Sequence, residues 1–108
     1  ERACEGLLNH PNVILCYILD DKGYQLDHPV YGIHSTNNLG YRYGKLSNTK
    51  GVNWSRRIYF QKAISEPMVT QITRPYLSLT TAHLCITLSI AIETENKLKV
   101  LCCDIMFH

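Results

Sequence analysis

The stretch from Asn53 to Ala63 concentrates the side chains of this sequence that are best suited to binding chemistry. It holds an indole, two guanidinium groups, a phenol and a phenyl ring, on Trp54, Arg56, Arg57, Tyr59 and Phe60. Aromatic rings supply large contact areas, and arginine supplies planar, permanently charged donors that match carboxylates and phosphates. The stretch is therefore either a ligand site or a helix whose aromatic side is core.

Asp104, which lies outside that stretch, is a further candidate for binding chemistry. In a C-terminal strand it shares one face with Val100, Cys102 and Met106, where an unpaired carboxylate is costly. It lies near solvent at the strand end, caps local backbone N–H groups, or faces a polar pocket. In the pocket it would pair with an arginine, another cation or a ligand amine, and the sequence leaves these alternatives open.

The sequence lacks the motifs of common catalytic and metal sites. No glycine-rich phosphate loop and no nucleophile elbow occurs. No paired helical spacing for a metal is found among the histidines, which are His10, His28, His34, His83 and His108. A Cys/His nucleophile pair can meet only in space, and nothing marks one cysteine as activated. We expect no enzymatic activity, no metal and no cofactor in this chain.

Length and charge indicate one globular domain with a basic middle. The 108 residues fit a single domain, 1–108, and a hydrophobic content of 45% is that of an ordinary globular protein. Between Gly40 and Pro75 only Glu66 opposes seven basic residues, Arg42, Lys45, Lys50, Arg56, Arg57, Lys62 and Arg74. This charge suits a small anion or an anionic membrane surface, or is simply a solvated face. We expect no nucleic-acid partner, because no recognised binding motif accompanies the charge.

The five cysteines are Cys4, Cys16, Cys85, Cys102 and Cys103. An odd number excludes complete internal pairing, and no Cys-x-x-Cys spacing is present. Most of them have apolar neighbours and are expected to be small buried hydrophobes. In an oxidising compartment one disulfide is possible, for example from Cys16 to Cys102 or Cys103.

The apolar stretches predict an antiparallel sheet. Val13–Leu19 is apolar on both alternating faces, as in a central strand covered on both sides. Asp20–Gly23 has turn composition, and Tyr24–Asp27 is expected to return as the second strand of a hairpin. Leu84–Ile92 alternates large aliphatic with small or polar residues, the period of a half-buried strand. Leu98–Phe107 then pairs back with it across a polar turn.

Two helices are expected beside these strands. Residues 1–10 form the first, which Pro11 ends. The second starts at a cap on Asn53 or Ser55 and ends near Ser65, because Pro67 disfavours a helical residue before it. Residues 28–53 form a long loop, and residues 68–79 are extended, with Pro75 at an edge or a bulge. The order of elements predicts an α+β domain.

Four segments together resemble the Cache family, the PAS-like extracytoplasmic sensor domains of bacterial chemoreceptors, histidine kinases and cyclic-di-GMP enzymes. The resemblance covers most of residues 13–106, and residues 15–25 are similar to the family's first hairpin. The segments are Trp54–Ala63, Arg74–Thr81, Ile86–Ile90 and Cys103–Ile105. The resemblance implies a five-stranded antiparallel sheet with a long N-terminal helix and a loop-helix segment over one face.

The resemblance also implies a ligand site between the sheet and the loop-helix segment. In amino-acid-binding members, an Arg-x-Trp-Tyr motif holds the ligand carboxylate, and Arg57-Ile58-Tyr59-Phe60 keeps its arginine while changing both aromatics. Tyr76 and Asp104 match residues that hold the ligand amine, but Ser78 replaces an aspartate. A small carboxylate or other anion therefore fits better than an amino acid. The expected ligand-binding residues are Trp54, Arg57, Tyr59, Phe60, Tyr76, Ser78 and Asp104.

We accordingly expect a small-molecule sensor domain, cut from a transmembrane signalling protein whose membrane spans lie outside residues 1–108. Its location is expected to be periplasmic or extracellular, and its assembly a homodimer through the N-terminal helix. The output is expected to be a cyclic-di-GMP enzyme or histidine kinase rather than a chemoreceptor. One alternative is a ligand-free PAS-like interaction module that mainly mediates dimerisation, with a pocket plugged by Trp54, Tyr59 and Phe60. Another is a redox or metal sensor that uses Cys102, Cys103 and nearby histidines.

Overall fold

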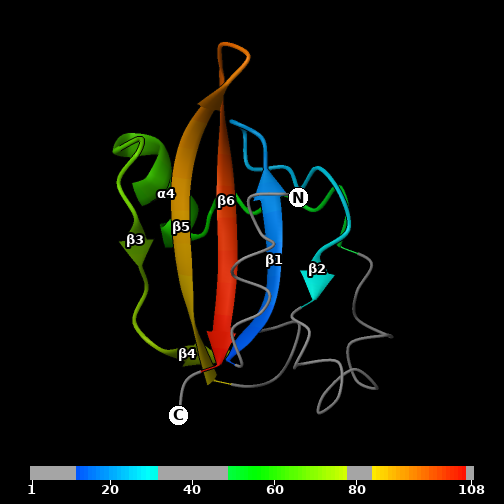
Figure 1. The fold of residues 1–108 in the computed structure, drawn as a ribbon, viewed down its shortest axis with the longest axis vertical. Helices are drawn as coiled ribbons and strands as arrows, with labels where there is room; N and C mark the ends of the chain where they lie inside the picture. Colours follow the sequence, from blue (N-terminus) through cyan, green and yellow to red (C-terminus); the bar gives the residue numbers. More distant parts are fainter. Residues whose placement is uncertain (1–11, 32–48, 78–83, 107–108) are drawn as a thin grey trace.

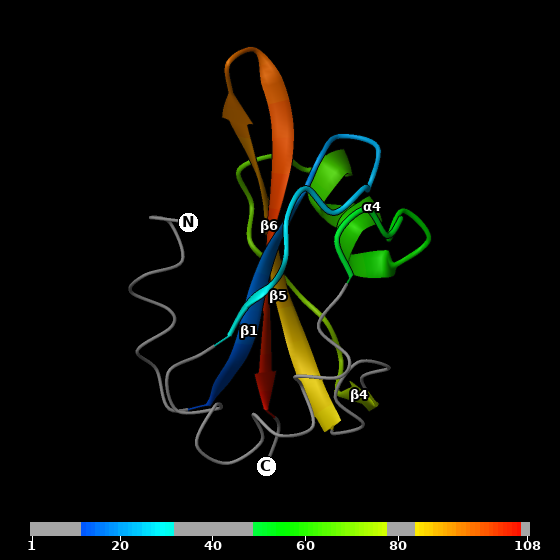
Figure 2. The same ribbon diagram turned by 90° about the vertical axis from the view of Figure 1, so that its right-hand side faces the viewer.

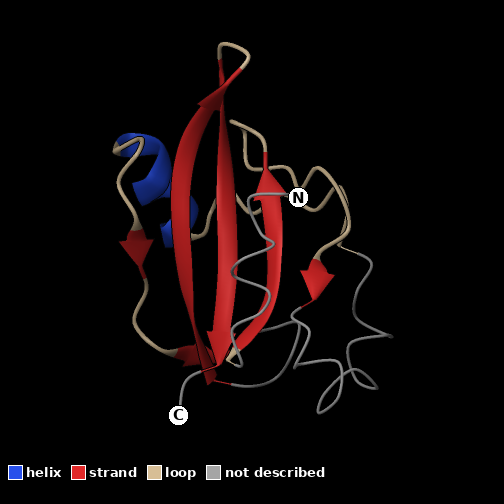
Figure 3. Ribbon diagram, in the orientation of Figure 1, coloured by secondary structure: helices blue, strands red, loops and turns tan. Residues whose placement is uncertain are grey.

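A computed structural model describes residues 12–31, 49–77 and 84–106. One helix and six strands occur in these ranges. Figures 1 and 3 show how they are arranged. The strands are β1 (Val13–Leu19), β2 (Val30–Tyr31), β3 (Gln71–Ile72), β4 (Tyr76–Leu77), β5 (Leu84–Thr94) and β6 (Lys97–Met106), and the helix is α4 (Ile58–Ser65). The N-terminal helix predicted for residues 1–10 and most of the predicted loop lie outside the described residues.

The strands form one antiparallel sheet, in the order β2-β1-β6-β5-β3. This confirms the prediction of a five-stranded antiparallel sheet, to which β4 adds a short sixth strand paired with β5. Residues 68–79 were predicted as one extended stretch, and in the structure they hold only the two-residue strands β3 and β4. Pro75 lies between them and has no N–H to donate to the ladder, which explains the interruption.

The hairpin of β5 and β6 is the centre of the sheet (Figure 1). Its strands were both predicted, and their register runs from Thr94 opposite Lys97 to Cys85 opposite Met106. Glu95 and Asn96 form the connection with φ values of 50° and 67°. Two central residues with positive φ make the type I′ turn, whose twist matches that of the flanking strands.

α4 covers one face of the sheet, here called the inner face, as Figure 2 shows from the side. On β5 the inner face carries the small residues of the alternation, and all four are buried: Cys85, Thr87, Ser89 and Ala91. The predicted period of two is confirmed, but the large aliphatics point to the opposite, outer face. Small side chains let the helix approach closely, and the Ser89 hydroxyl donates a 2.8 Å hydrogen bond to the Tyr59 carbonyl of α4.

The end of α4 was predicted correctly, at Ser65, two residues before Pro67. Its start was not. The N-cap is Arg57, which makes no side-chain capping bond. Asn53 instead accepts a 2.9 Å hydrogen bond from the Ser55 N–H in a turn that precedes the helix. The polar side chains were correctly associated with the approach to the helix, but they stabilise this turn and not the helical N–H groups.

The strand predicted for Tyr24–Asp27 is reduced to two isolated bridges, Leu19 to Gln25 and Tyr24 to Asn53. The Gln25 side chain donates a 2.7 Å hydrogen bond to the carbonyl of Asp27, which gives this segment a local alternative to strand pairing. The chain next pairs with β1 only at β2, where Val30 lies opposite Cys16.

Candidate functional site

A buried polar cluster lies on the inner face at the centre of the sheet. Asp104 of β6 is directly opposite Thr87 of β5 and is 4% exposed. The Thr87 hydroxyl donates a 2.8 Å hydrogen bond to Asp104 Oδ1 and lies 2.5 Å from the Tyr76 hydroxyl. Since a hydroxyl has one proton, Tyr76 donates to Thr87 and Thr87 donates to Asp104. Three positions were possible for Asp104: near solvent, bonded to local backbone N–H groups, or facing polar side chains. The structure shows the third.

Burial raises the pKa of Asp104 to about 6, and hydrogen bonds from Thr87 and Tyr17 and the charge of Arg57 oppose the rise. The same burial, with the nearby Asp104 charge, raises the pKa of Tyr17 and of Tyr76. These phenols therefore stay protonated and can act as donors. The cluster is a carboxylate surrounded by hydroxyl groups, which are the kinds of polar groups that orient a ligand in a pocket.

Tyr59 joins the cluster from α4. Its hydroxyl accepts a 2.7 Å hydrogen bond from the Tyr17 hydroxyl, and the two rings meet edge to face with centroids 6.4 Å apart. Tyr59 and Phe60 are 5% and 6% exposed and belong to the main core with Ala63. The aromatic side of the Asn53–Ala63 stretch is therefore core, the second of the two readings that its sequence allowed.

Arg57 and Trp54 form a separate corner at the start of α4. The Trp54 indole N–H donates a 3.0 Å hydrogen bond to Gln25, and the Arg57 guanidinium carbon lies 5.7 Å from the centroid of the indole ring. Within the described ranges Arg57 makes no ion pair, so Asp104 is held by hydroxyl groups and not by this arginine. An open hollow of about 700 Å³ lies here, lined by Asn53, Trp54, Ser55, Arg56 and Arg57.

The structure thus brings Tyr59, Tyr76 and Asp104 together, and places Arg57 and Trp54 beside them. Ser78 lies outside the described residues. Tyr17 and Thr87 were missed as cluster members, and Gln25 was missed as the partner of Trp54. A two-residue turn at Glu95-Asn96 would have placed Thr87 opposite Asp104 from sequence alone, because the register of a hairpin follows from its turn.

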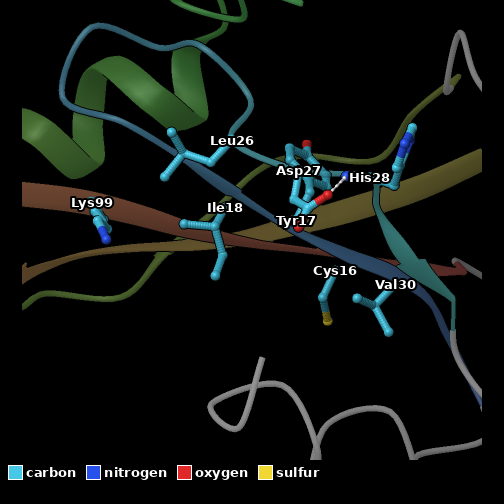
Figure 4. A pocket seen from close by; sticks show the side chains of 8 residues that line it. All are labelled: Cys16, Tyr17, Ile18, Leu26, Asp27, His28, Val30 and Lys99. Atoms are coloured by element: carbon cyan, nitrogen blue, oxygen red, sulfur yellow. Dashed lines mark hydrogen bonds between the residues drawn. The ribbon is translucent and has the colours of Figure 1, made fainter. Parts of the chain in front are cut away.

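A second hollow of about 220 Å³ lies at the other side of β1 (Figure 4). Cys16 and Val30, which are paired across β1 and β2, lie beside each other in it. Asp27, His28 and Lys99 bring polar groups, and the remaining lining residues are Tyr17, Ile18 and Leu26. None of the predicted ligand-binding residues lies here.

The four described cysteines are buried thiols. Cys16 lies opposite Cys103 in the β1–β6 register, yet no disulfide joins any pair among the residues that the structure describes. Burial raises the pKa of the Cys102 thiol, which lowers its reactivity. The expectation of small buried hydrophobes therefore fits better than the redox alternative. No group of three or more metal-binding side chains is found in the described ranges.

Comparison with known proteins supports the fold and leaves the family open. No protein-family model and no curated protein sequence matches the chain. The YkuI protein of Bacillus subtilis, which has an EAL domain and was solved with substrate c-di-GMP and calcium, matches with a TM-score of 0.68 and 20% identity. The match covers 98% of this chain and 25% of YkuI, so the chain spans about a quarter of that protein.

The PAS domain of an HTR-like protein from Haloarcula marismortui matches with a TM-score of 0.56 and 13% identity, over 98% of this chain and 90% of the PAS domain. The chain has a PAS-like fold. Among the residues that the structure describes, no helix is long and apolar enough to cross a membrane.

Proposed function

We propose that this domain is a PAS-like sensor that binds a small polar molecule at the inner-face cluster of Tyr76, Thr87 and Asp104. The observation that carries the proposal is Asp104. Burying a carboxylate among neutral hydroxyl groups costs free energy of folding. Such groups are found most often at functional sites, where the carboxylate accepts a hydrogen bond from a ligand or changes its protonation.

Arg57 gives the proposed ligand a second contact. Its guanidinium is half-buried, is steadied by the Trp54 ring, and has no carboxylate partner within the described ranges. An anionic group on the ligand would form charge-assisted hydrogen bonds there, while a donor group on the same molecule would reach Asp104. A small carboxylate that also carries a hydrogen-bond donor meets both requirements.

The signalling context is part of the proposal. The similarity to a quarter of YkuI, a protein with an EAL domain, supports a place beside a cyclic-di-GMP output in a longer chain. The resemblance to Cache domains implies a position outside the cytoplasm and a homodimer formed through the N-terminal helix. Both remain predictions that require the intact protein.

A second function, an interaction module with a filled interior, has its own supporting observation. Tyr17, Tyr59 and Phe60 occupy the space between α4 and the inner face, and each is at most 7% exposed. Such packing leaves a ligand little room beneath the helix, so binding would have to use the side of the cluster near Tyr76, which is half-buried.

A thermal-shift screen with carboxylates, amines, amino acids and nucleobases separates the two functions. A ligand at 100 times its Kd stabilises a domain by about 2.7 kcal/mol, which raises Tm by several degrees. We expect Arg57→Ala and Asp104→Asn to abolish that rise, and Lys62→Ala, at an exposed basic residue farther along α4, to keep it. A ligand that still raises Tm in both site variants would show that it binds elsewhere. A screen without any stabilising compound would favour the interaction module.

A further inference from the structure

The three side chains of the inner-face cluster form a chain of hydrogen bonds with a defined direction. The Tyr76 hydroxyl oxygen lies 2.5 Å from that of Thr87, and the Thr87 hydroxyl donates to Asp104 over 2.8 Å. An ionised carboxylate can only accept, so it takes the single proton of Thr87, and Thr87 in turn accepts the proton of Tyr76. While Asp104 is ionised, both hydroxyl protons therefore point towards it.

Tyr76 is the end of this chain of hydrogen bonds that a ligand can meet. Thr87 and Asp104 are 0% and 4% exposed, whereas Tyr76 on the short strand β4 is half-buried. Because the Tyr76 proton is committed to Thr87, its oxygen offers a lone pair to a ligand. The charge of Asp104 thus acts on a ligand through two hydroxyl groups rather than by direct contact.

We propose that the site selects a ligand whose polar group donates a hydrogen bond to Tyr76, with Thr87 and Asp104 as the positioning residues that set this preference. The preference rests on the proposed function, since it concerns the same site. Together with the anion contact at Arg57, it specifies a hydroxy carboxylate over the oxo carboxylate of the same carbon skeleton. An oxo group has only lone pairs, which the Tyr76 oxygen repels. A hydroxyl group brings one donor for one acceptor, whereas an ammonium group brings three donors.

Asp104 is the group of the cluster whose charge changes between about pH 5 and pH 7.5, because burial raises its pKa to about 6. Burial also raises the pKa of the phenols and the thiol around it, so these groups stay neutral, and the guanidinium stays charged. The ionisable groups that face Asp104 are Tyr17 of β1, Arg57 and Tyr59 at the start of α4, Tyr76 of β4 and Cys102 of β6. Once protonated, Asp104 no longer fixes the direction of the hydrogen bonds, and the preference for a donor decreases.

Isothermal titration calorimetry of the 108-residue chain with two matched pairs of probes tests the preference. The pairs are L-lactate with pyruvate, and 3-hydroxybutyrate with acetoacetate. At pH 7.5 we expect each hydroxy carboxylate to bind about tenfold more tightly than its oxo partner, the effect of one hydrogen bond that is either made or opposed. The difference should be smaller at pH 5, where Asp104 is neutral.

Variants of Thr87 separate its hydroxyl group from its packing. Thr87→Val should remove the difference between the paired probes, because Tyr76 can then turn its proton towards the ligand. Thr87→Ser keeps the hydroxyl group and should retain the difference. Thr94→Val is the matched control, since it makes the same change at a buried hydroxyl group outside the cluster and should also retain it. Unchanged far-UV circular dichroism would show that the variants are folded.

Raman spectroscopy of the ligand-free chain tests the direction of the hydrogen bonds separately from binding. The intensity ratio of the tyrosine Fermi doublet distinguishes a phenol that donates its proton from one that accepts a proton. Subtracting the spectrum of Tyr76→Phe isolates the signal of Tyr76. We expect the signal of a donor in wild type and in Thr87→Ser, and its loss in Thr87→Val.

Three results would overturn the proposal. An accepting Tyr76 in the wild-type Raman spectrum would contradict the direction of the hydrogen bonds, whether or not a ligand binds. An oxo carboxylate that binds as tightly as its hydroxy partner would contradict the preference and leave the proposed function in place. A donating Tyr76 without binding of any of the four probes would overturn the ligand class together with the proposed function, and the direction of the hydrogen bonds would stand.

Discussion

Thr87 and Asp104 lie directly opposite each other in the β5–β6 hairpin, and the Thr87 hydroxyl donates a 2.8 Å hydrogen bond to the Asp104 carboxylate. The buried carboxylate of Asp104 is therefore held by a neutral donor, the Thr87 hydroxyl. The pKa of Asp104, raised by burial to about 6, lies within the range in which cellular pH varies. The stability of the fold is therefore coupled to pH through one residue at the centre of the candidate site.

Asp104→Asn should remove a pH dependence with a defined sign. The pKa of about 6 in the folded state exceeds the value of about 3.9 expected in the unfolded chain, so ionisation of Asp104 destabilises the fold as pH rises from about 4 to about 6. The advantage of the variant over wild type should grow by about 2.4 kcal/mol between pH 4 and pH 7.5.

Urea denaturation followed by fluorescence of Trp54, the only tryptophan, measures this difference. Asp21→Asn, at an exposed position in the turn after β1, serves as the matched control and should show the same effect at both pH values. A constant difference between Asp104→Asn and wild type across this range would contradict the assignment.

Thr87→Val should destabilise the fold by about 1–3 kcal/mol at pH 7.5, because it removes the Thr87 donor from Asp104 and the acceptor of the Tyr76 hydroxyl. The loss should be smaller at pH 4.5, where Asp104 is protonated. Thr94→Val is the control, since the Thr94 hydroxyl is buried and has no hydrogen-bond partner in the described part of the chain. Equal losses at both pH values would show that Thr87 supports packing rather than the carboxylate.

The sequence could predict β1, β5, β6 and the end of α4, because period-two patterns and Pro67 act locally. It could not predict which face of β5 the helix covers. Ile86, Leu88 and Ile90 have the composition of a core, yet the small side chains of Thr87 and Ser89 are the ones buried under α4. That choice depends on how closely a helix approaches, which no local pattern records.

The candidate site was predictable to a similar extent. Asp104 was singled out because a carboxylate in an apolar strand needs a partner, and the structure gives it one. Arg57 was taken as a ligand contact from the motif, and its placement over Trp54 depends on the turn before α4. Tyr17 was hidden because every side chain of β1 is apolar or aromatic, so none of them marks a polar cluster.

Gly23→Ala should destabilise the fold more than Gly51→Ala, although both glycines have positive φ values, 94° and 85°. A methyl group on Gly23 would lie 2.8 Å from the backbone of Ser55, whereas at Gly51 nothing lies within 4 Å. We expect about 1 kcal/mol at Gly51 from backbone strain alone and at least about 2 kcal/mol at Gly23. Urea denaturation gives both values, and equal losses would mean that the contact with Ser55 relaxes without cost.

Tyr17→Phe should cost more stability than Tyr59→Phe. The Tyr17 hydroxyl donates its one proton to Tyr59 over 2.7 Å, and its nearby dipole also lowers the pKa of Asp104, so its removal affects two groups. We expect about 2 kcal/mol for Tyr17→Phe and about 1 kcal/mol for Tyr59→Phe, with the double variant below the sum because the two share one bond. Tyr24→Phe, at a ring that is 48% exposed, is the control and should change little.

Urea denaturation at pH 7.5 completes this double-mutant cycle, and strictly additive losses would contradict the direct bond.

The Tyr17–Tyr59 pair also bears on function. If a ligand must displace the Tyr59 hydroxyl from Tyr17, Tyr59→Phe lowers that cost, and the ligand should bind more tightly to the variant. If the ligand instead enters beside Tyr76, its affinity should be the same for Tyr59→Phe and wild type, because neither hydroxyl of the pair lies in its path.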